Sequence, residues 1–325
     1  MNMNRKKILI LGGMGFIGSN LAIRLVGEGA DVTIVDSMLP RYGGNLKNIS
    51  PVEDKVTINY SDIRDQHSLD YLVRGKDIIY SVAGQTSHIE SMNDPYTDLD
   101  INCRSQISLL ESCRKNNPKV KIIYASTRQL YGKPEYLPVD EKHPTNPVDV
   151  NGINKLAAER YYTLYSEIYG MHTVSLRLTN TYGPRQHLSG DTQGFTGIFI
   201  RKALNKEKIK IFGDGLQKRD FNFIDDVTDA FLLATRNYSL SGKSFNLGSN
   251  EIYSLLEFTE KLNSILNFEY EIIPFPKEHK KIDIGDYYGD FSSFSSYTGW
   301  KPEVSLKEGL VRTIEYFKPI KQFYY

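Results

Sequence analysis

The stretch LILGGMGFIGSN, residues 9–20, places Gly12, Gly15 and Gly18 directly after an apolar run and at the start of a helical pattern. Such glycines suit a tight turn, a close approach of the backbone to a pyrophosphate, and close packing of the helix on its strand. The N-terminus of that helix would face the phosphate charge. The stretch therefore predicts a dinucleotide-binding turn, and the residues expected to form it are Gly12, Gly15, Phe16, Ile17 and Gly18.

A carboxylate follows this turn at the distance that dinucleotide-binding folds use. Asp36 ends the second apolar run, about 20 residues after Gly15. There it can bind the hydroxyls of the adenosine ribose and would repel a 2′-phosphate, so the expected cofactor is NAD rather than NADP. Asp62 and Ile63 follow the third apolar run, and they either flank the adenine or serve only the fold.

Short β-branched runs alternate with helical patterns over the first half of the chain. The runs that predict strands are 7–11, 31–36, 56–62, 77–84, 120–127 and 172–180. Continuous apolar runs of this length are typical of parallel strands that are covered on both faces. Repeated strand–helix units of this kind predict an α/β fold with a doubly wound parallel Rossmann sheet, whose ligands bind beyond the carboxyl ends of the strands.

After Tyr182 this alternation stops. Helical patterns at 196–208 and 225–237 surround a strand pattern at 208–215, and capping boxes at Ser254–Glu257 and Ser305–Glu308 predict two later helices. Residues 244–249 again have the pattern of a strand. We therefore expect an NAD-binding lobe over 1–182, joined by segments near 220–250, and a smaller α/β substrate lobe that is mainly 183–325, with a cleft between them.

The composition of the 325 residues argues against several other classes of protein. The formal net charge of +1, from 40 basic and 39 acidic residues, gives no support for a nucleic-acid partner or an acidic membrane surface. The apolar run near the N-terminus is too short for a signal peptide or a membrane span, so a soluble cytoplasmic protein is expected. Cys103 and Cys113 would lie about 15 Å apart on one helix, too far for a disulfide, and no Cys/His cluster indicates a metal site.

Five further segments together carry a family resemblance. They are SVAGQTSHIESMNDP (81–95), ASTRQLYGKP (125–134), LRLTNTYGPRQ (176–186), IFGDGLQKRDFNFIDDV (211–227) and SLKEGLVRTIEYF (305–317). With the glycine turn, they resemble the nucleotide-sugar epimerase/dehydratase family of extended short-chain dehydrogenases/reductases. The resemblance implies bound NAD, a nucleoside-diphosphate sugar, and hydride abstraction from sugar C4 to give a 4-keto sugar. It also implies a homodimer formed through the helices around 100–115 and 152–169, and a role in polysaccharide biosynthesis.

The resemblance assigns catalytic positions, and one of them departs from the family pattern. Thr127 matches the Ser or Thr that binds the sugar 4-hydroxyl. Asn151 and Lys155 occupy the YxxxK pair, so the lysine that holds the nicotinamide ribose is kept while the catalytic tyrosine is an asparagine. An amide accepts no proton at neutral pH, and general base catalysis is worth about 10²- to 10⁴-fold. His88, expected in the loop after the fourth strand, is the preferred substitute, since an ordinary imidazole pKa suits a base; Tyr131 and Tyr161 are alternatives.

The resemblance also bears on the reaction type and on phosphate binding. The Asp-Glu pair of the family's 4,6-dehydratases is replaced here by Arg128 and Gln129, neither of which can act as that acid and base. Dehydration by that route is therefore not expected. The residues that match diphosphate contacts are Asn180, Arg219 and, less closely, Arg185.

A second phosphate-binding arginine that the family often carries is replaced by Asp283, so either this loop is displaced or Lys280 or Lys281 substitutes.

The leading hypothesis is an NAD-dependent 4-epimerase of a nucleotide sugar. Two alternatives stay open. One is a 4-dehydrogenase, which would accumulate reduced cofactor and a keto sugar. The other is a non-catalytic protein that binds NAD and a nucleotide sugar.

Overall fold

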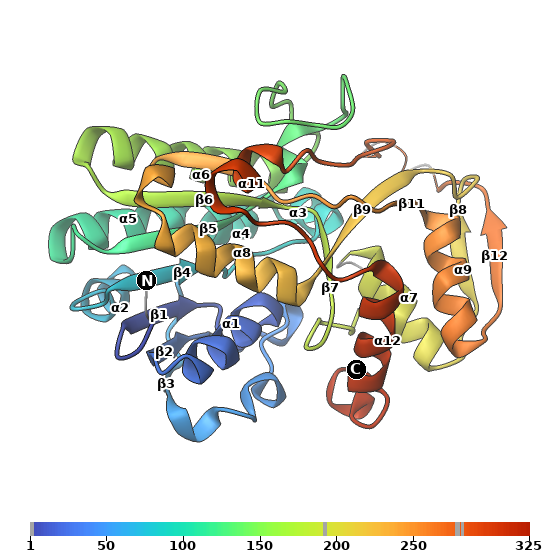
Figure 1. Cartoon of the computed structure of the whole chain (residues 1–325), viewed down its shortest axis with the longest axis horizontal. Coiled ribbons are helices and arrows are strands. Elements are labelled where there is room, and N and C mark those ends of the chain that lie inside the picture. Colours follow the sequence, from blue (N-terminus) through green and yellow to red (C-terminus); the bar gives the residue numbers. More distant parts are fainter. Residues whose placement is uncertain (1–2, 191–193, 277–279, 281–282) are drawn as a thin grey trace.

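The computed structural model describes residues 3–190, 194–276, 280 and 283–325. Within them, one large sheet has seven parallel strands (Figure 1). Its strands are β1 (Lys7–Leu11), β2 (Asp31–Val35), β3 (Val56–Asn59), β4 (Ile78–Ser81), β5 (Lys121–Thr127), β6 (His172–Leu178) and β10 (Lys243–Asn246). Their order is β10-β6-β5-β4-β1-β2-β3, so the predicted doubly wound Rossmann sheet is confirmed.

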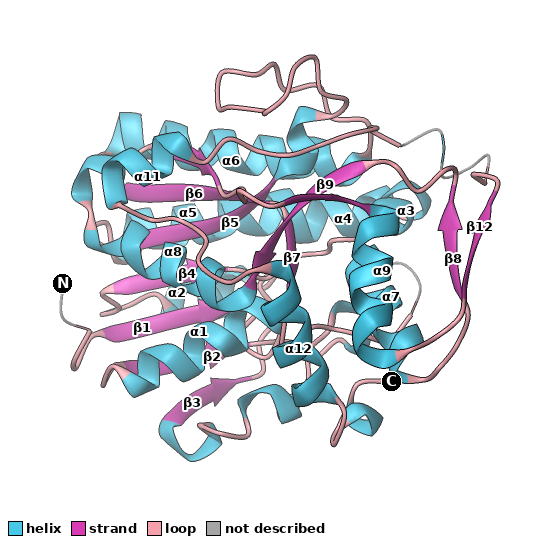
Figure 2. Cartoon of the chain, turned by 45° about the vertical axis from the view of Figure 1, so that its right-hand side comes forward, coloured by secondary structure: helices cyan, strands magenta, loops and turns pink. Residues whose placement is uncertain are grey.

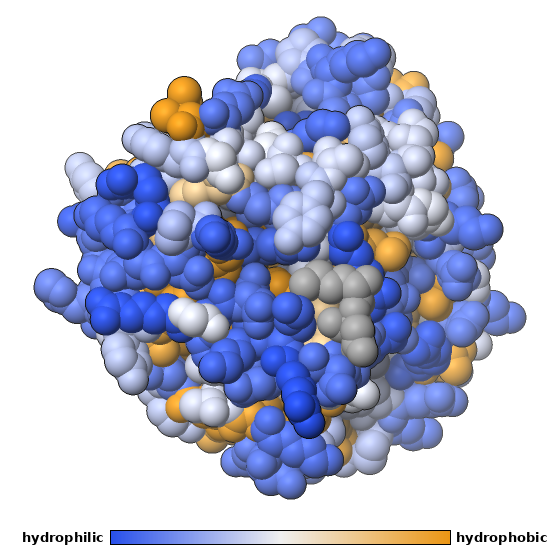
Figure 3. Space-filling model, turned by 60° about the vertical axis from the view of Figure 1, so that its left-hand side comes forward, coloured by the Kyte–Doolittle hydropathy of each residue, from blue (hydrophilic) through white to orange (hydrophobic). Residues whose placement is uncertain are grey.

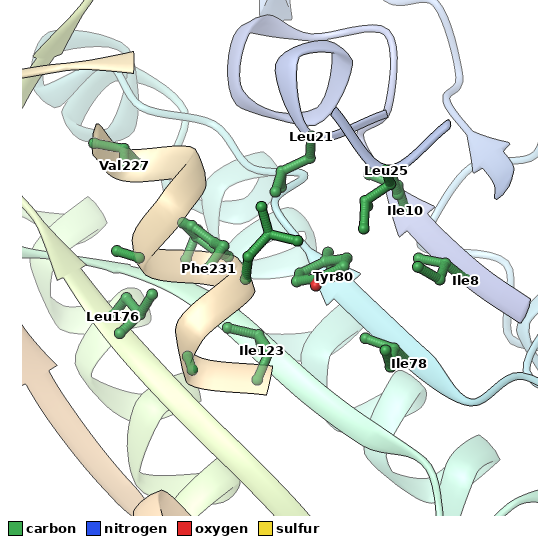
Figure 4. Packing of buried hydrophobic residues seen from close by; sticks show 14 of the residues in the cluster. Ile8, Ile10, Leu21, Leu25, Ile78, Tyr80, Ile123, Leu176, Val227 and Phe231 are labelled. Atoms are coloured by element: carbon green, nitrogen blue, oxygen red, sulfur yellow. The ribbon is translucent and has the colours of Figure 1, made fainter. Parts of the chain in front are cut away.

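Helices cover both faces of this sheet, and side chains of each strand alternate between two apolar cores. The helices are α1 (Phe16–Gly27), α2 (Gln66–Leu72), α3 (His88–Asn93), α4 (Pro95–Leu99), α5 (Ser105–Asn116), α6 (Val150–Tyr169) and α8 (Ile224–Arg236). Ile8 and Ile10 of β1 lie in the core under α1 and α8, as Figure 4 shows, with Phe231 of α8 between the strands and the helix. Leu9 and Leu11 lie in the opposite core, under α2, α5 and α6.

The second lobe is smaller, and its core combines aliphatic residues with many aromatic ones. Its elements are β7 (Asn180–Tyr182), α7 (Phe195–Leu204), β8 (Ile209–Phe212), β9 (Lys218–Phe223), β11 (Ile252–Ser254), α9 (Leu255–Leu266), β12 (Tyr270–Ile273) and α12 (Leu306–Phe317). Figure 2 shows α7, α9 and α12 beside the strands of this lobe. The rings of Phe221 and Phe258 are stacked with centroids 5.0 Å apart. The predicted return of 244–249 to the large sheet is seen in β10, which pairs with β6, while α11 (Ser292–Thr298) packs beside β10.

Three local expectations differ from the structure. The predicted strand 172–180 is split, because β6 ends at Leu178 and β7 starts a different sheet; Thr179 between them donates its hydroxyl to the buried carboxylate of Asp220. The capping box at Ser254 is complete, whereas Ser305 only accepts from the Glu308 amide, with no return bond from the Glu308 side chain among the described residues. His88 begins α3 rather than lying in a loop.

The surface matches the balanced charge of the sequence. The face shown in Figure 3 is largely hydrophilic, with hydrophobic residues dispersed among polar ones. None of the described helices is both long and apolar enough to cross a membrane.

Candidate active site

A cavity of about 460 Å³ opens at the carboxyl ends of the large sheet's strands, where the strand order reverses between β1 and β4. Residues of both lobes line it. Of the positions that the sequence singles out, those in the lining are Gly12, Gly15, Phe16, Ile17, Gly18, Asp36, Asp62, Ile63, His88, Thr127, Asn151, Lys155, Asn180 and Arg219. Side chains scattered over more than 200 positions are thus brought to one cavity.

The glycine turn has the geometry that a dinucleotide needs. Gly12 has a φ of 83°, and a Cβ there would lie 2.7 Å from the backbone of Ala83. A Cβ on Gly18 would lie 2.1 Å from the carbonyl oxygen of Gly12, so the helix could not pack so closely on the turn. Gly15 is the N-cap of α1, whose first turn faces the cavity. The backbone is therefore open to a pyrophosphate at the positive end of a helix.

Two carboxylates lie at the end of the cavity that follows β2 and β3. Asp36 accepts hydrogen bonds from the amides of Met14 and Met38, each at 3.0 Å. Burial raises the pKa of Asp36, while these backbone bonds act in the opposite direction. Asp62 is paired with Arg64 at 2.6 Å, and that hydrogen bond lowers the pKa of the carboxyl. The arrangement leaves Asp36 oxygens next to the cavity as acceptors for ribose hydroxyls, so the residues present fit NAD.

Lys155 is buried at the cavity, and its ammonium donates a hydrogen bond to the carbonyl oxygen of Ala125 at 3.2 Å. Gly84 makes room for it, since a Cβ at that position would lie 3.0 Å from Nζ. Burial lowers the pKa of Lys155 to about 8, and the nearby carboxylate of Asp98 acts against that shift. At neutral to alkaline pH a fraction of this lysine is deprotonated. An anionic ligand, or a hydroxyl that accepts its hydrogen bond, favours the protonated form.

Asn151, in the expected place of the catalytic phenol, belongs to a buried polar network. Its Nδ2 donates to the carbonyl oxygen of Gln85 at 2.8 Å and to Asp98 Oδ2 at 3.0 Å. Asp98 also receives the amides of Asn102 at 3.0 Å and Asn154 at 2.8 Å. Three side-chain amides thus donate hydrogen bonds to the carboxylate of Asp98, which is inaccessible to solvent. No described residue donates to Asn151 Oδ1, so that atom is left as an acceptor.

His88 lies in a chain of three side chains at the cavity wall. Its Nδ1 is hydrogen-bonded to Asp149 Oδ2, and its Nε2 lies 2.5 Å from the amide nitrogen of Gln129. A carboxylate only accepts, so Nδ1 carries the proton, and the Gln129 amide donates to an unprotonated Nε2. Asp149 is the N-cap of α6, where its other oxygen accepts from the Gly152 amide at 2.7 Å. The ring is therefore oriented as a base would be.

Thr127 ends β5 at the same wall. Its Oγ1 accepts a hydrogen bond from the backbone N–H of Gln129 at 3.3 Å, which caps the 3₁₀ turn Arg128–Tyr131. The hydroxyl proton of Thr127 remains available to a ligand in the cavity. The two alternative phenols do not line the cavity. Tyr131 is instead bonded to Asn246 and Arg177, and burial raises its pKa to about 12.

The predicted phosphate contacts divide into two groups. Arg219 lines the cavity; its Nη1 donates to the carbonyl oxygens of Lys218 and Gly285, and its Nη2 lies 3.9 Å from Asp283. Burial, and then the positive charge of Arg128, lower the pKa of Arg219 to about 10. Asn180 lines the cavity too, although its Nδ2 donates to the carbonyl oxygen of Asp220 at 2.9 Å.

Arg185 lies away from the cavity lining, where it donates to Asn20 Oδ1 at 2.9 Å and to the carbonyl oxygen of Asn48 at 3.2 Å. The acid at position 283 is thus a partner of Arg219 and not part of a displaced loop far from it. Lys280 is exposed, and Lys281 lies outside the described residues.

The sequence did not indicate two side chains of this site, Arg128 in the cavity lining and Asp149 behind His88. Asp149 occupies the N-cap position of α6, where aspartate is common. The capping role is therefore a sufficient reason for an aspartate there, and the sequence gives no sign that its side chain also contacts His88. Arg128, considered only as the loss of a dehydratase acid, lines the cavity beside Thr127. A buried charge that has no counter-charge in its own segment is the signal that could have drawn attention to it.

Comparison with known proteins places the chain among sugar-nucleotide enzymes. The profile described as the NAD dependent epimerase/dehydratase family matches residues 8–248. A putative UDP-glucose 4-epimerase of Methanocaldococcus jannaschii is 38% identical over 315 residues, covering 96% of this chain and 98% of the relative. The crystal structure of Thermotoga maritima UDP-glucose 4-epimerase with UDP-glucose is 30% identical, with a TM-score of 0.88, covering 96% of this chain and 99% of that one. The Thermus thermophilus UDP-glucose 4-epimerase in complex with NAD is 28% identical, with a TM-score of 0.85, covering 97% and 99%.

Proposed function

The chain belongs to the NAD-dependent epimerase/dehydratase family, and from that premise we propose that it interconverts the two C4 epimers of a nucleoside-diphosphate sugar through a transient 4-keto sugar. NAD is its cofactor, and when bound it supplies the acceptor for a hydride from sugar C4 and later the donor of the same hydride. The relatives named UDP-glucose 4-epimerase support the choice of C4. The replacement of the dehydratase acid and base by Arg128 and Gln129 argues against water elimination.

The observation that carries the proposal is the hydrogen-bonded chain Asp149–His88–Gln129 at the wall that also bears Thr127. In the forward half-reaction, the proton of the sugar 4-hydroxyl passes to His88 Nε2 as the C4–H bond breaks and a C4=O bond forms. Asp149 holds the ring through Nδ1 and stabilises the imidazolium that results. The base that the family places at position 151 is thus supplied from α3.

Gln129 must give way to the sugar, because its amide nitrogen lies against the nitrogen that takes the proton. Its Oε1 is buried and has no hydrogen-bond partner among the described residues. Rotation of the amide would turn this oxygen toward Nε2 and make it an acceptor for the protonated ring. Gln129 can therefore hydrogen-bond His88 in both protonation states: its amide nitrogen donates to the neutral ring, and its Oε1 accepts from the protonated ring.

The remaining residues of the site bind the substrate and the cofactor and orient them. Thr127 donates its hydroxyl to the oxygen at C4, and Asn151 Oδ1 offers an acceptor to a neighbouring hydroxyl. Lys155, at the base of the cavity, binds the ribose next to the nicotinamide. Arg219 and Asn180 hold the diphosphate. After the keto sugar has turned its other face to the cofactor site, His88 returns the proton to the oxygen at C4. Bound NAD would supply the hydride for C4, so the net reaction would be redox-neutral.

The test of this function is incubation of the NAD-loaded protein with UDP-, GDP-, CDP- and dTDP-sugars, followed by mass spectrometry and NMR. A product of unchanged mass and inverted C4 is the expected result. Accumulation of a keto sugar with reduced cofactor would show a dehydrogenase instead. Tight binding without any product would show a binding protein.

We also propose a homodimer formed through α6 and its neighbouring helices. The exposed residues Ile153, Leu164 and Ile168 fall on one side of α6, and exposed Tyr96 and Leu99 belong to α4, which packs against α6. Changing Leu164 and Ile168 together to Glu is expected to reduce the native mass from two chains to one. A single-chain mass for the unsubstituted protein would contradict the proposal.

A further inference from the structure

Arg128 carries a charge into the cavity and forms no ion pair with a described residue, although the carboxylates of Asp220 and Asp149 are near enough to raise its pKa against the effect of burial. It lines the cavity directly after Thr127, and its guanidinium lies over the ring of Tyr287 at 4.9 Å. Nη2 makes one long hydrogen bond, 3.4 Å, to Asn180 Oδ1. Nη1 is inaccessible to solvent and has no partner, and Arg128 forms no ion pair within the part of the chain that the structure describes.

The surroundings make this charge costly in the absence of a ligand. Burial lowers the pKa of Arg128, and the positive charge of Arg128 in turn lowers that of Arg219. The acidic residues in the cavity lining, Asp36 and Asp62, follow β2 and β3 at the cofactor end. The substrate end therefore presents two neighbouring guanidinium groups. Arg219 lies 3.9 Å from Asp283, whereas Arg128 is half-buried and its inaccessible Nη1 has no hydrogen-bond partner among the described residues. A guanidinium left in this state is normally retained for a ligand.

The position of Arg128 separates its role from that of Arg219. Arg219 is fixed by the carbonyl oxygens of Lys218 and Gly285, in the second lobe. Arg128 directly follows Thr127 in the chain, at the cavity that His88 also lines, and it contacts Asn180. The proposed function puts the reacting carbon of the sugar beside Thr127 and His88. A substituent carried by a ring carbon adjacent to C4 would contact Arg128. A planar fork of donors suits a carboxylate in particular.

We propose that Arg128 binds a carboxylate carried by the sugar, so that the substrate is the nucleoside diphosphate of an acidic sugar such as a hexuronic acid. This inference rests on the proposed function in that it takes a sugar nucleotide as the occupant of the cavity. It assigns the substrate class and leaves the C4 chemistry unchanged.

The test is equilibrium binding, by titration calorimetry, of UDP-glucuronate, UDP-glucose and UDP to the full-length NAD-loaded protein. The unsubstituted protein should bind UDP-glucuronate at least about tenfold more tightly than UDP-glucose, as expected for a charge-assisted contact. Arg128→Met should remove that difference and leave the affinities for UDP-glucose and UDP nearly unchanged. Arg128→Gln repeats the comparison if the first variant does not fold.

Two results would overturn the inference. One is an unsubstituted protein without preference for the acidic sugar. The other is an equal loss of affinity for all three ligands in the Arg128 variant, which would make Arg128 a diphosphate contact. Arg219→Met is the matched control, expected to weaken all three ligands alike. Because binding is measured without turnover, a protein that prefers UDP-glucuronate but forms no epimer would refute the proposed function and leave this inference standing.

Discussion

The imidazole of His88 shares a hydrogen bond with Asp149, the residue that caps the helix carrying Asn151 and Lys155. The carboxylate therefore has two tasks: it starts α6 and it orients a ring that belongs to α3, 61 positions earlier in the chain. In the proposed function this contact lets the imidazole replace the phenol that position 151 lacks. The proposed base belongs to α3 and is held by the residue that caps α6.

His88→Ala should lower turnover by at least about tenfold, because it removes the proton acceptor, while leaving NAD binding unchanged. His88→Gln, which keeps a hydrogen-bonding side chain without a base, should be equally slow. Steady-state rates and NAD affinity, measured on the same samples, check this. Full activity in either variant would retire the imidazole as the base.

Asp149→Asn separates the two tasks of Asp149. Asparagine is as good an N-cap as aspartate, so thermal stability should change little, whereas turnover should fall on the order of 10²-fold because the ring loses its charged partner. Asp149→Ala should lose the turnover and, in addition, about 1 kcal/mol of stability. Equal activity in the Asn variant and the parent would show that Asp149 serves only as a cap.

Asn151→Tyr should not restore a faster enzyme. The substitution removes the two N–H groups that satisfy Gln85 and Asp98, so the free energy of unfolding should drop by about 1–3 kcal/mol. Turnover should not rise, because His88 already supplies the base. Chemical denaturation and steady-state kinetics test both statements; a stable and faster variant would mean that the site accepts a phenol and that the asparagine is not required by its network.

Lys155 should make stability depend on pH in an unusual direction. Its pKa is about 8 in the folded protein, against 10.5 as the reference value. Below about pH 8 both states hold the proton and the folded state bears the cost of the buried charge. Between the two values the unfolded chain holds more protons, so stability rises with pH. The difference between the ligand-free protein and Lys155→Met, followed by denaturation from neutral pH to about pH 10, should show this rise; a difference that is constant with pH would contradict it.

Asp283→Asn should tighten the binding of UDP by a few-fold. The carboxylate lies 3.9 Å from Arg219 Nη2 and competes with a phosphate for that guanidinium. Asp286→Asn, a change of the same kind at an acid that accepts the Lys218 amide instead, is the control and should have less effect. Weaker binding after the change at 283 would mean that the ion pair holds Arg219 in position.

The Rossmann sheet could be predicted because its information is local. Strands such as 7–11 are apolar throughout, since both faces are covered, and the glycine turn that follows is a short-range signal. The break after β6 could not be foreseen, because residues 172–180 contain no glycine or proline that would mark the end of a strand. The strand ends where Thr179 donates its hydroxyl to Asp220, 41 positions away.

The cavity shows the same limit. A resemblance between sequences placed Thr127, Lys155 and Arg219, which keep their residue types at expected positions. It gave no indication of the contact between Asp149 and His88 or of the unpaired charge on Arg128, because each depends on which distant side chains meet. Asn151 could be recognised as a departure from the family, whereas its reason, the amide network around Asp98, required the fold.

The proposed epimerisation requires the transfer of a hydride from C4 and back to the same carbon. The decisive measurement is NMR of the product formed from a sugar nucleotide deuterated at C4, with the unsubstituted protein and with His88→Ala. We expect the C4 epimer to form with its deuterium retained, and to form at least about tenfold more slowly in the variant. Loss of the deuterium to solvent, or the absence of any epimer across the sugar-nucleotide panel, would contradict it.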